Sequence, residues 1–431
     1  MKLGLKPDSV VRNRSFALLW SSQSLSLVGT QITLVALPLT AVVVLNATPM
    51  QAGVLGFLER LPYLLFAPLI GVLVDRGRRR PLLIGSDAVR ALLLGSIPVS
   101  YGLGFLSIGQ LFVVAFVIGM MTVVFDVSYQ AFLPGLVGRG HLVEANGRLQ
   151  ISESLAQVAG PGLAGLLIGV LRPPVVVAID AISYLVSALS LLGVKRDERP
   201  APPPSGTALS IRASLREGLD MVLRHPVLRW AMIAGAVGNF FFDALTAVFF
   251  LFLIRDVGTG AGGVSLIISV GSVGALCGAF CLGPVTRFLG TGRSLLVSTA
   301  LPGVGVLGLA TVHGGGIGLV TAAAANFVVL FAVPIYNVTI ISLRQAVTPD
   351  HLLGRVVATV RMISWGALAL GSLAGGALGG RIGLRETVLV AGVGLFVPTV
   401  ILWFSPVRHM RSVQELSDDD STASPQAARS E

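Results

Sequence analysis

The sequence predicts an all-α polytopic membrane protein, and three observations support that prediction. Of the 431 residues, 54% are hydrophobic and only 12% are charged, whereas soluble domains carry about 25% charged residues. Apolar runs of about 20 residues, each long enough to cross the hydrocarbon core as a helix, recur along nearly the whole chain. Because backbone polar groups inside a bilayer must be paired within their own segment, these runs are expected to be helices.

Twelve membrane-spanning helices are expected, and the polar stretches between them set their limits. In the first half, the spans are expected near residues 16–45, 51–74, 81–104, 108–136, 148–171 and 174–194. In the second half, they are expected near residues 227–254, 262–289, 293–312, 316–343, 357–380 and 386–405. The first run is too long for the core of a signal peptide, so it is interpreted as a retained helix. Glycine and proline inside the runs do not exclude helices, because membrane helices tolerate both.

One long polar segment, residues 195–225, divides the spans into two sets of six. Its proline-rich start is typical of a semi-rigid linker, and its second part, 209–224, is compatible with a surface helix. The expected organisation is an N-terminal six-helix bundle (1–194), a central cytoplasmic loop (195–225), a C-terminal six-helix bundle (226–410) and a disordered tail (411–431). A faint repeat with an offset of 210 residues fits two parallel, pseudo-symmetric halves, as in secondary transporters.

The distribution of basic residues predicts how the chain is oriented. Lysine and arginine gather in the N-terminus and in residues 75–80, 139–148 and 195–224, whereas the opposite side carries only Arg172, Arg255, Arg381 and Arg385. Because cytoplasmic loops are enriched in lysine and arginine, both termini are expected in the cytoplasm, with the protein in the inner or plasma membrane. The net charge of +10 is explained by these loops, so no nucleic-acid partner is expected.

The loop after the second span, GVLVDRGRRRP (71–81), resembles a motif of the major facilitator superfamily. That motif is Gly, three residues, Asp, Arg, any residue, Gly and two basic residues, and the matching positions are Gly71, Asp75, Arg76, Arg79 and Arg80. Arg78 stands where the second glycine is expected. The resemblance, which extends over residues 12–410, implies the superfamily's twelve-helix fold and a gating latch formed by Asp75 across the domain interface. As charge alone, the arginines would only hold the loop in the cytoplasm.

A second motif, AQVAGPGLAGLLIG in the fifth span, resembles the glycine–proline motif of drug–proton antiporters. The matching residues are Gly160, Pro161, Ala164 and Gly165. The stretches FDVSYQAFLPGLV, LVEANGRL and IDAISYLVSAL resemble the exporter branch that includes macrolide and siderophore exporters. The kink at the motif is either plain helix geometry or a device that favours exchange over leak. This branch often has an acidic residue in the first span, where this chain has Thr30, so a proton site is not expected there.

Polar side chains inside the spans are the candidate site residues, because a charged group at membrane depth costs about 2.5–3.5 kcal/mol or more. The resemblance implies that spans 1, 4, 7 and 10 line a central cavity. The candidates there are Gln23 and Gln31, then Asp126, Tyr129 and Gln130, then Asn239, Asp243 and Thr246, and finally Asn326, Tyr336 and Asn337. The three residues of span 4 share one helical face, as do those of span 7.

Asp126 is the first candidate for a proton-titrating group. Burial of a carboxyl group disfavours its charged form, so that protonation would report whether substrate is bound. The alternative is a carboxylate that is hydrogen-bonded to neighbouring helices in a purely structural role. The same two interpretations apply to Asp243.

Five further charged residues lie inside spans 2, 3 and 6. Glu59 and Arg60 point about 100° apart and are expected to find different partners, either as a gate or as static packing. Asp87 and Arg90 are three residues apart and are expected to pair on one helical face in a static role. Asp180 is interpreted as a local hydrogen-bond acceptor.

The leading hypothesis is secondary active export of a small amphipathic compound, of the drug, antibiotic or siderophore type, by proton antiport with alternating access. The first alternative is uptake or facilitated diffusion of a small molecule. A membrane-embedded enzyme would need convergent catalytic side chains or metal ligands, and a non-transporting sensor would need an extra soluble domain; the sequence offers neither. The expected partners are the substrate, protons and the lipid bilayer, with no cofactor or metal, and the chain is expected to work as a monomer.

Overall fold

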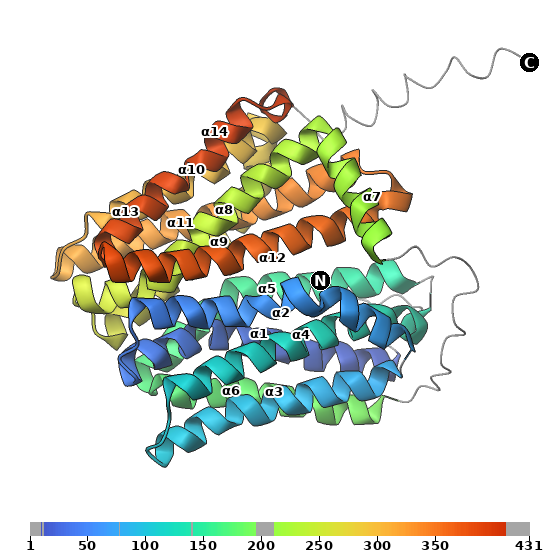
Figure 1. The fold of residues 1–431 in the computed structure, drawn as a ribbon, viewed down its shortest axis with the longest axis horizontal. Helices are drawn as coiled ribbons and strands as arrows, with labels where there is room; N and C mark the ends of the chain where they lie inside the picture. Colours follow the sequence, from blue (N-terminus) through green and yellow to red (C-terminus); the bar gives the residue numbers. More distant parts are fainter. Residues whose placement is uncertain (1–9, 11–12, 77, 139–140, 195–210, 411–431) are drawn as a thin grey trace, which may run out of the picture. The chain divides into compact units, whose positions relative to one another are not determined.

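The computed structural model describes residues 10, 13–76, 78–138, 141–194 and 211–410, and these residues form helices joined by short connections (Figure 1). No β-strand occurs among them, so the predicted all-α class is confirmed. The chain divides into two compact units, Met1–Ala208 with Val264–Ser269 and Leu209–Gly263 with Val270–Glu431. We call them the N-terminal unit and the C-terminal unit. The predicted tail (411–431) and the first part of the predicted loop (195–210) lie outside the described residues.

Six long helices build the N-terminal unit, and each corresponds to one predicted span. They are α1 (Arg14–Leu39), α2 (Pro49–Arg76), α3 (Arg79–Gly102), α4 (Ile108–Val137), α5 (Leu142–Val170) and α6 (Pro173–Gly193), with the π-helical turn η2 (Thr40–Val44) extending α1. α5 begins about two turns before its apolar run. The polar start is stabilised by Glu144, which lies in the first turn and pairs with Arg148 at 3.1 Å, one helical turn away.

The C-terminal unit contains a short amphipathic helix followed by the second set of spans. Its elements are α7 (Ile211–Arg224), α8 (Pro226–Leu251), η4 (Phe252–Asp256), α9 (Ala261–Leu289), α10 (Thr291–Ala310), α11 (Gly316–Val347), α12 (Asp350–Arg381), α13 (Leu384–Gly394), α14 (Val397–Trp403) and η5 (Pro406–His409). One stretch of α9, Val264–Ser269, is assigned to the N-terminal unit. The last predicted span is broken into α13 and α14. Pro398 lies at the start of α14, and its missing N–H removes one helical hydrogen bond at the break.

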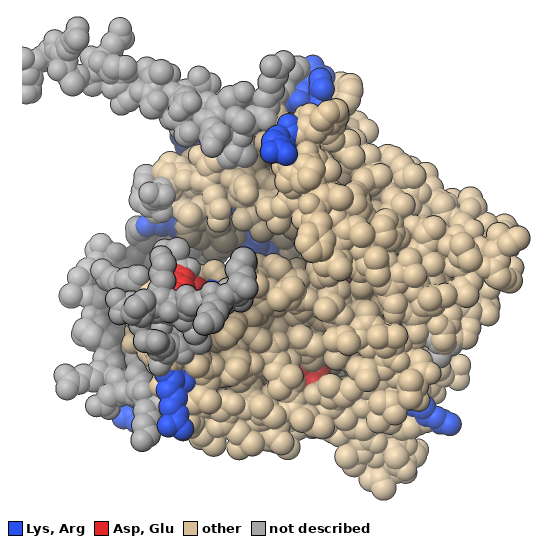
Figure 2. Space-filling model, turned by 180° about the vertical axis from the view of Figure 1, so that it is seen from behind, with Lys and Arg blue, Asp and Glu red and all other residues tan. Residues whose placement is uncertain are grey.

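The described helices have the length and hydropathy that membrane crossing requires. Eleven helical segments of the described chain meet both conditions, and the remaining predicted span is the 28-residue helix α2. The face drawn in Figure 2 agrees: among the described residues, uncharged side chains cover the helices almost continuously, while lysine and arginine lie toward the margins. This is a multi-pass membrane protein.

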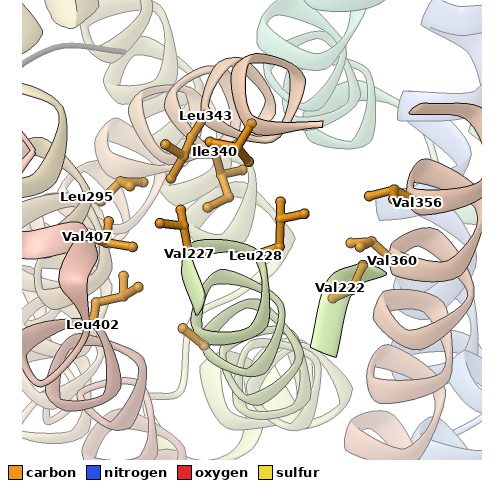
Figure 3. Close-up of a cluster of buried hydrophobic side chains, with 12 residues drawn as sticks. Val222, Val227, Leu228, Leu295, Ile340, Leu343, Val356, Val360, Leu402 and Val407 are labelled. Carbon is orange, nitrogen blue, oxygen red and sulfur yellow. The ribbon is translucent and has the colours of Figure 1, made fainter. Parts of the chain in front are cut away.

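The core of the C-terminal unit holds α7 against the ends of the membrane helices. Side chains from α7, α8, α10, α11, α12, α14 and η5 meet in one buried apolar cluster, in which Val222 of α7 faces Val356 and Val360 of α12 (Figure 3). Glu217 of α7 forms an ion pair with Arg355 of α12. The surface helix predicted over 209–224 is therefore confirmed from Ile211 onward.

Small residues allow close helix packing in both units, as is common in membranes. In the C-terminal unit, Gly274 and Gly278 of α9 lie so near α11 that an added Cβ would be 2.4 Å and 2.0 Å from the carbonyl oxygens of Phe327 and Phe331. These two glycines are therefore packing positions between α9 and α11.

The two units share one irregularity at the end of their first membrane helix. The π-helical turns η2 and η4 begin at Thr40 and Phe252, 212 residues apart. In each turn a backbone N–H donates to the carbonyl oxygen of the residue five positions earlier. Leu45 donates to Thr40 at 3.3 Å in the first unit, and Val257 donates to Phe252 at 3.0 Å in the second. A left-handed residue follows each turn, with φ of 51° at Asn46 and 74° at Gly258. This shared geometry supports the faint sequence repeat.

Candidate functional site

A pocket of about 230 Å³ opens inside the C-terminal unit, between α8, α10, α11, α12 and the broken last span. Most of its wall is apolar, with the ring of Phe242 and side chains such as Val333, Leu368 and Leu395. Two prolines, Pro302 and Pro398, also line it. The full set of lining residues is Ala234, Gly235, Gly238, Asn239, Phe242, Ser298, Thr299, Pro302, Val333, Tyr336, Asn337, Leu368, Leu395 and Pro398. None of these described lining residues is charged.

Neutral hydrogen-bonding groups enter the pocket from three helices. α8 contributes Asn239, α11 contributes Tyr336 and Asn337, and α10 contributes Ser298 and Thr299. Amides both donate and accept hydrogen bonds, as do hydroxyl groups. An apolar wall with a few such groups is the usual composition of a site for a small organic molecule.

The hydroxyl groups on α10 are held in place by their own helix. Ser298 donates to the Leu295 carbonyl at 3.1 Å and Thr299 to the same carbonyl at 2.9 Å. Thr399 of α14 then donates to the Thr299 hydroxyl at 2.9 Å. Helical spacing in the sequence does not reveal either α10 residue, because their place at the pocket depends on the packing of α10 against α11, α13 and α14.

The predicted cavity residues of this unit fall into two groups. Asn239, Tyr336 and Asn337 lie together in the lining of this pocket. Asp243 lies one turn further along α8 and is buried, 2% exposed, away from the pocket lining. Asn326 contacts α9 instead, where a Cβ on Gly271 would lie 2.1 Å from its amide nitrogen.

The N-terminal unit contains a buried polar network around Arg90 of α3. Its guanidinium donates to the Asp87 carboxylate at 2.6 Å, and both side chains are almost fully buried. The predicted pairing of these two residues is therefore confirmed. The guanidinium also lies between two rings, 4.6 Å from the centre of Phe125 on α4 and 4.4 Å from that of Tyr184 on α6, which gives it cation–π contacts on both faces.

The same network reaches α1 and α6. The hydroxyl groups of Tyr184 and Thr30 are 2.7 Å apart, and Gln23 of α1 donates to Ser187 of α6 at 3.2 Å. On α6, Ser183 donates to the Asp180 carboxylate at 3.0 Å. Thr30, where an exporter of this type often has an acid, is thus the α1 member of a neutral hydrogen bond.

The three predicted residues of span 4 have different surroundings. Asp126 of α4 accepts a hydrogen bond from the Tyr63 hydroxyl of α2 and is half-buried. The ring of Tyr129 stacks on Phe125, with centroids 5.9 Å apart, whereas Gln130 is exposed. The sequence pattern did not reveal Tyr63, because a partner on another helix leaves no mark in helical spacing.

Glu59 and Arg60 correct an expectation. They were expected to find different partners, but the Arg60 guanidinium lies 3.6 Å from the Glu59 carboxylate. Both side chains are long and flexible, so they bend toward each other although their Cα–Cβ bonds diverge. Arg60 also donates to the Gly56 carbonyl, one turn back on α2, at 3.1 Å.

The glycine–proline motif of α5 packs against α1. A Cβ on Gly160 would lie 2.3 Å from the Cβ of Gln31, so only glycine fits this contact. Pro161 follows inside the helix, Ala164 is fully buried, and Gly165 comes one residue later. Gln31, predicted as a cavity residue, is therefore a contact of the motif.

The loop motif divides into described and undescribed parts. The surroundings of Gly71 and the side chains of Asp75 and Arg76 lie outside what the structure describes. Arg79 donates to the Ala131 carbonyl of α4 at 2.9 Å. Arg80 donates to the carbonyls of Leu191 and Leu192 at 2.9 Å and 2.5 Å, in the last turn of α6, where a cation complements the helix dipole.

No three His, Cys, Asp or Glu side chains among the residues that the structure describes are grouped so as to hold a metal ion.

Comparison with known proteins gives a family and two efflux pumps. The family model described as Major Facilitator Superfamily matches residues 19–368. The multidrug efflux pump Tap of Mycolicibacterium fortuitum is 28% identical over 386 residues, which cover 88% of this chain and 92% of the pump. Macrolide efflux protein A of Streptococcus pyogenes is 25% identical over 383 residues, with coverage of 88% and 92%.

Solved structures show the same fold at lower identity. A mutant of the nucleoside transporter NupG matches with a TM-score of 0.72 and 11% identity, covering 90% of this chain and 99% of that chain. A bacterial homologue of the iron transporter ferroportin, in its inward-facing state, matches with a TM-score of 0.67 and 17% identity, covering 90% and 98%. At such identities the likeness concerns the fold alone.

Proposed function

Because the chain belongs to the major facilitator superfamily, and is therefore a transporter and not an enzyme, we propose that it exports a small amphipathic compound by proton antiport with alternating access. The observation that carries the proposal is the uncharged pocket of the C-terminal unit. The relatives named as multidrug and macrolide efflux proteins support export as the direction.

The pocket narrows the class of substrate. Its described lining has no charged side chain that would compensate an ionic group, and burying an unpaired charge is costly. Of the drug, antibiotic and siderophore types, it favours neutral or weakly charged compounds with an apolar body and a few hydrogen-bonding groups. The volume of about 230 Å³ is below the ~300–1,000 Å³ of usual ligand pockets. It would therefore hold a small compound, or one group of a larger compound such as a macrolide.

Asn239 and Asn337 would set the orientation of the substrate, while the apolar wall supplies most of the binding energy. Each buried Å² of apolar surface contributes about 25 cal/mol, and one neutral hydrogen bond adds about 0.5–1.5 kcal/mol. Gly160 and Pro161 would shape the α1–α5 contact, and the 71–80 loop would act as the gate, with Asp75 as its latch. Both termini would face the cytoplasm of the inner or plasma membrane, and one chain would form the working transporter.

The test is transport of labelled erythromycin into everted membrane vesicles from cells that express the protein. We expect accumulation when the vesicle interior is acidified, and its loss when an ionophore collapses the pH gradient. Asn239→Ala and Asn337→Ala should each raise KM about three- to tenfold, which corresponds to one lost hydrogen bond. Thr321→Ala is the matched control, since Thr321 lies on α11 outside the pocket lining and its hydroxyl donates only to the Ile317 carbonyl of its own helix among the hydrogen bonds described, at 2.9 Å.

Two results would contradict the proposal. Substrate flux that is the same with and without every imposed pH gradient excludes proton antiport and is consistent with facilitated diffusion. Accumulation only in right-side-out vesicles reverses the direction and makes the protein an importer.

A further inference from the structure

Two buried carboxylates face one buried guanidinium in the N-terminal unit. Asp87 and Asp180 are each 1% exposed, and Arg90 is 4% exposed. Asp180 of α6 interacts electrostatically with both Asp87 and Arg90 of α3, and α3 packs along α6. Arg90 lies about 16 Å along α3 at 1.5 Å per residue, close to the middle of the helix.

The charges of this group do not balance if both acids are ionised. Arg90 gives its hydrogen bond to the Oδ1 atom of Asp87, while Oδ2 of Asp87 is buried and receives no hydrogen bond from a charged side chain among the described residues. An uncompensated charge in a low-dielectric interior is expensive, and the group neutralises instead. With one guanidinium and two carboxyl groups, neutrality requires one bound proton.

The remaining groups around the network do not supply a second cation. The half-buried Asp126 of α4 also interacts with Arg90, as does the hydroxyl of Tyr184 on α6. α1, which packs against α6, has no acidic or basic residue after Arg14 and meets the network through neutral groups such as Thr30. Every described charged neighbour other than Arg90 is therefore an acid.

We propose that Asp87 and Asp180 share one exchangeable proton and form the proton-binding site of the transporter, in place of Asp126. Release breaks the O–H bond of the protonated carboxyl group; the electron pair stays on the carboxylate and the proton passes to water. This inference rests on the proposed proton antiport. The contacts Arg90–Tyr184 and Tyr184–Thr30 join the proton-binding site to α1, and through them protonation would be coupled to the movement of helices during transport.

The test measures proton binding by the purified full chain in detergent, without substrate. Infrared difference spectra are recorded between about pH 5 and about pH 9. We expect one protonated carboxyl band that disappears as the pH rises. Asp180→Asn and Asp87→Asn should each abolish it, because the remaining acid then pairs with Arg90 one to one and stays ionised. Asp126→Asn and Asp243→Asn should leave it in place, and Asp180→Glu should restore a titrating band at a shifted frequency.

The outcomes separate this site from the proposed function. A wild-type spectrum without any titrating band, or a band removed by Asp126→Asn or Asp243→Asn, overturns the site even if transport is proton-coupled. If an Asp→Asn variant does not fold, the proposed site is still tested by the wild-type spectrum and by the spectrum of Asp180→Glu, whose titrating band should lie at a shifted frequency. A band with the expected pattern in a protein whose transport ignores the pH gradient would uphold the site and overturn the antiport proposal.

Discussion

Two arginine side chains, Arg80 and Arg90, have different surroundings, and these surroundings determine what each one does. Arg80 donates to two backbone carbonyls in the last turn of α6, those of Leu191 and Leu192, where helix carbonyls lack their usual i+4 partners. Arg90 lies at membrane depth between two aromatic rings and beside a carboxylate. Arg80 therefore anchors a helix end, whereas the contacts of Arg90 stabilise a positive charge at a depth where an unpaired charge would be costly.

Arg80→Gln should lower the stability of the folded protein, because it removes the cation from the last turn of α6. Hydrogen bonds to charged groups contribute about 1.5–3 kcal/mol each, and partial replacement by the amide leaves an expected loss of about 1–3 kcal/mol. The measurement is thermal unfolding in detergent. Arg78→Gln removes the same charge from an exposed position nearby and should have little effect. Slower transport at unchanged stability would instead show that Arg80 acts in gating.

For single residues, the sequence predicts contacts within one helix better than contacts between residues of different helices. Asp87 and Arg90 are predicted from their spacing, since a helix brings i and i+3 together. The contacts of Arg90 with Phe125 and Tyr184 come from two other helices and leave no periodic signal. The error at Glu59 and Arg60 has a simpler cause: directions of Cβ atoms do not fix where long side chains end.

At the scale of elements, the contact between α1 and α5 depends on a single missing side chain. Gly160→Ala places a methyl group 2.3 Å from the Cβ of Gln31, which neither helix accommodates without moving. We expect a lower melting temperature and less monodisperse protein in size-exclusion chromatography, with a cost of about 1–3 kcal/mol, as for overpacked cores.

Gly147→Ala is the control on the same helix, because an added Cβ there meets nothing within 4 Å. It should be neutral or stabilising by up to about 1 kcal/mol, through helix propensity. Equal effects of the two substitutions would show that the close approach at Gly160 does not matter for folding.

Apolar runs predict the helices well but not where they end. α5 and α12 start at Leu142 and Asp350, several residues before their apolar stretches, because polar turns continue beyond the part that lipid surrounds. The pocket was only partly predictable. Asn239 and Asn337 were expected in a cavity by family resemblance, whereas Ser298 and Thr299 join them through tertiary packing alone.

At the scale of the whole molecule, the prediction concerns orientation in the membrane. With both termini in the cytoplasm, the connection after α10 faces outward and the end of the last span faces inward. In a background of Cys277→Ala and Cys281→Ala, Thr311→Cys should react with a membrane-impermeant maleimide on intact cells. Arg408→Cys should react only after permeabilisation. Both positions are exposed, so the reverse pattern would invert the topology.

The paired π-helical turns have a consequence for the history of the chain. Regular helices arise independently in unrelated proteins, because lipid imposes them. A wide turn closed by a hydrogen bond across five residues and followed by one left-handed residue is not imposed by lipid, and it recurs 212 residues later. Its recurrence is the mark that duplication of one segment would leave, with Asn46 and Gly258 at equivalent positions of the two copies.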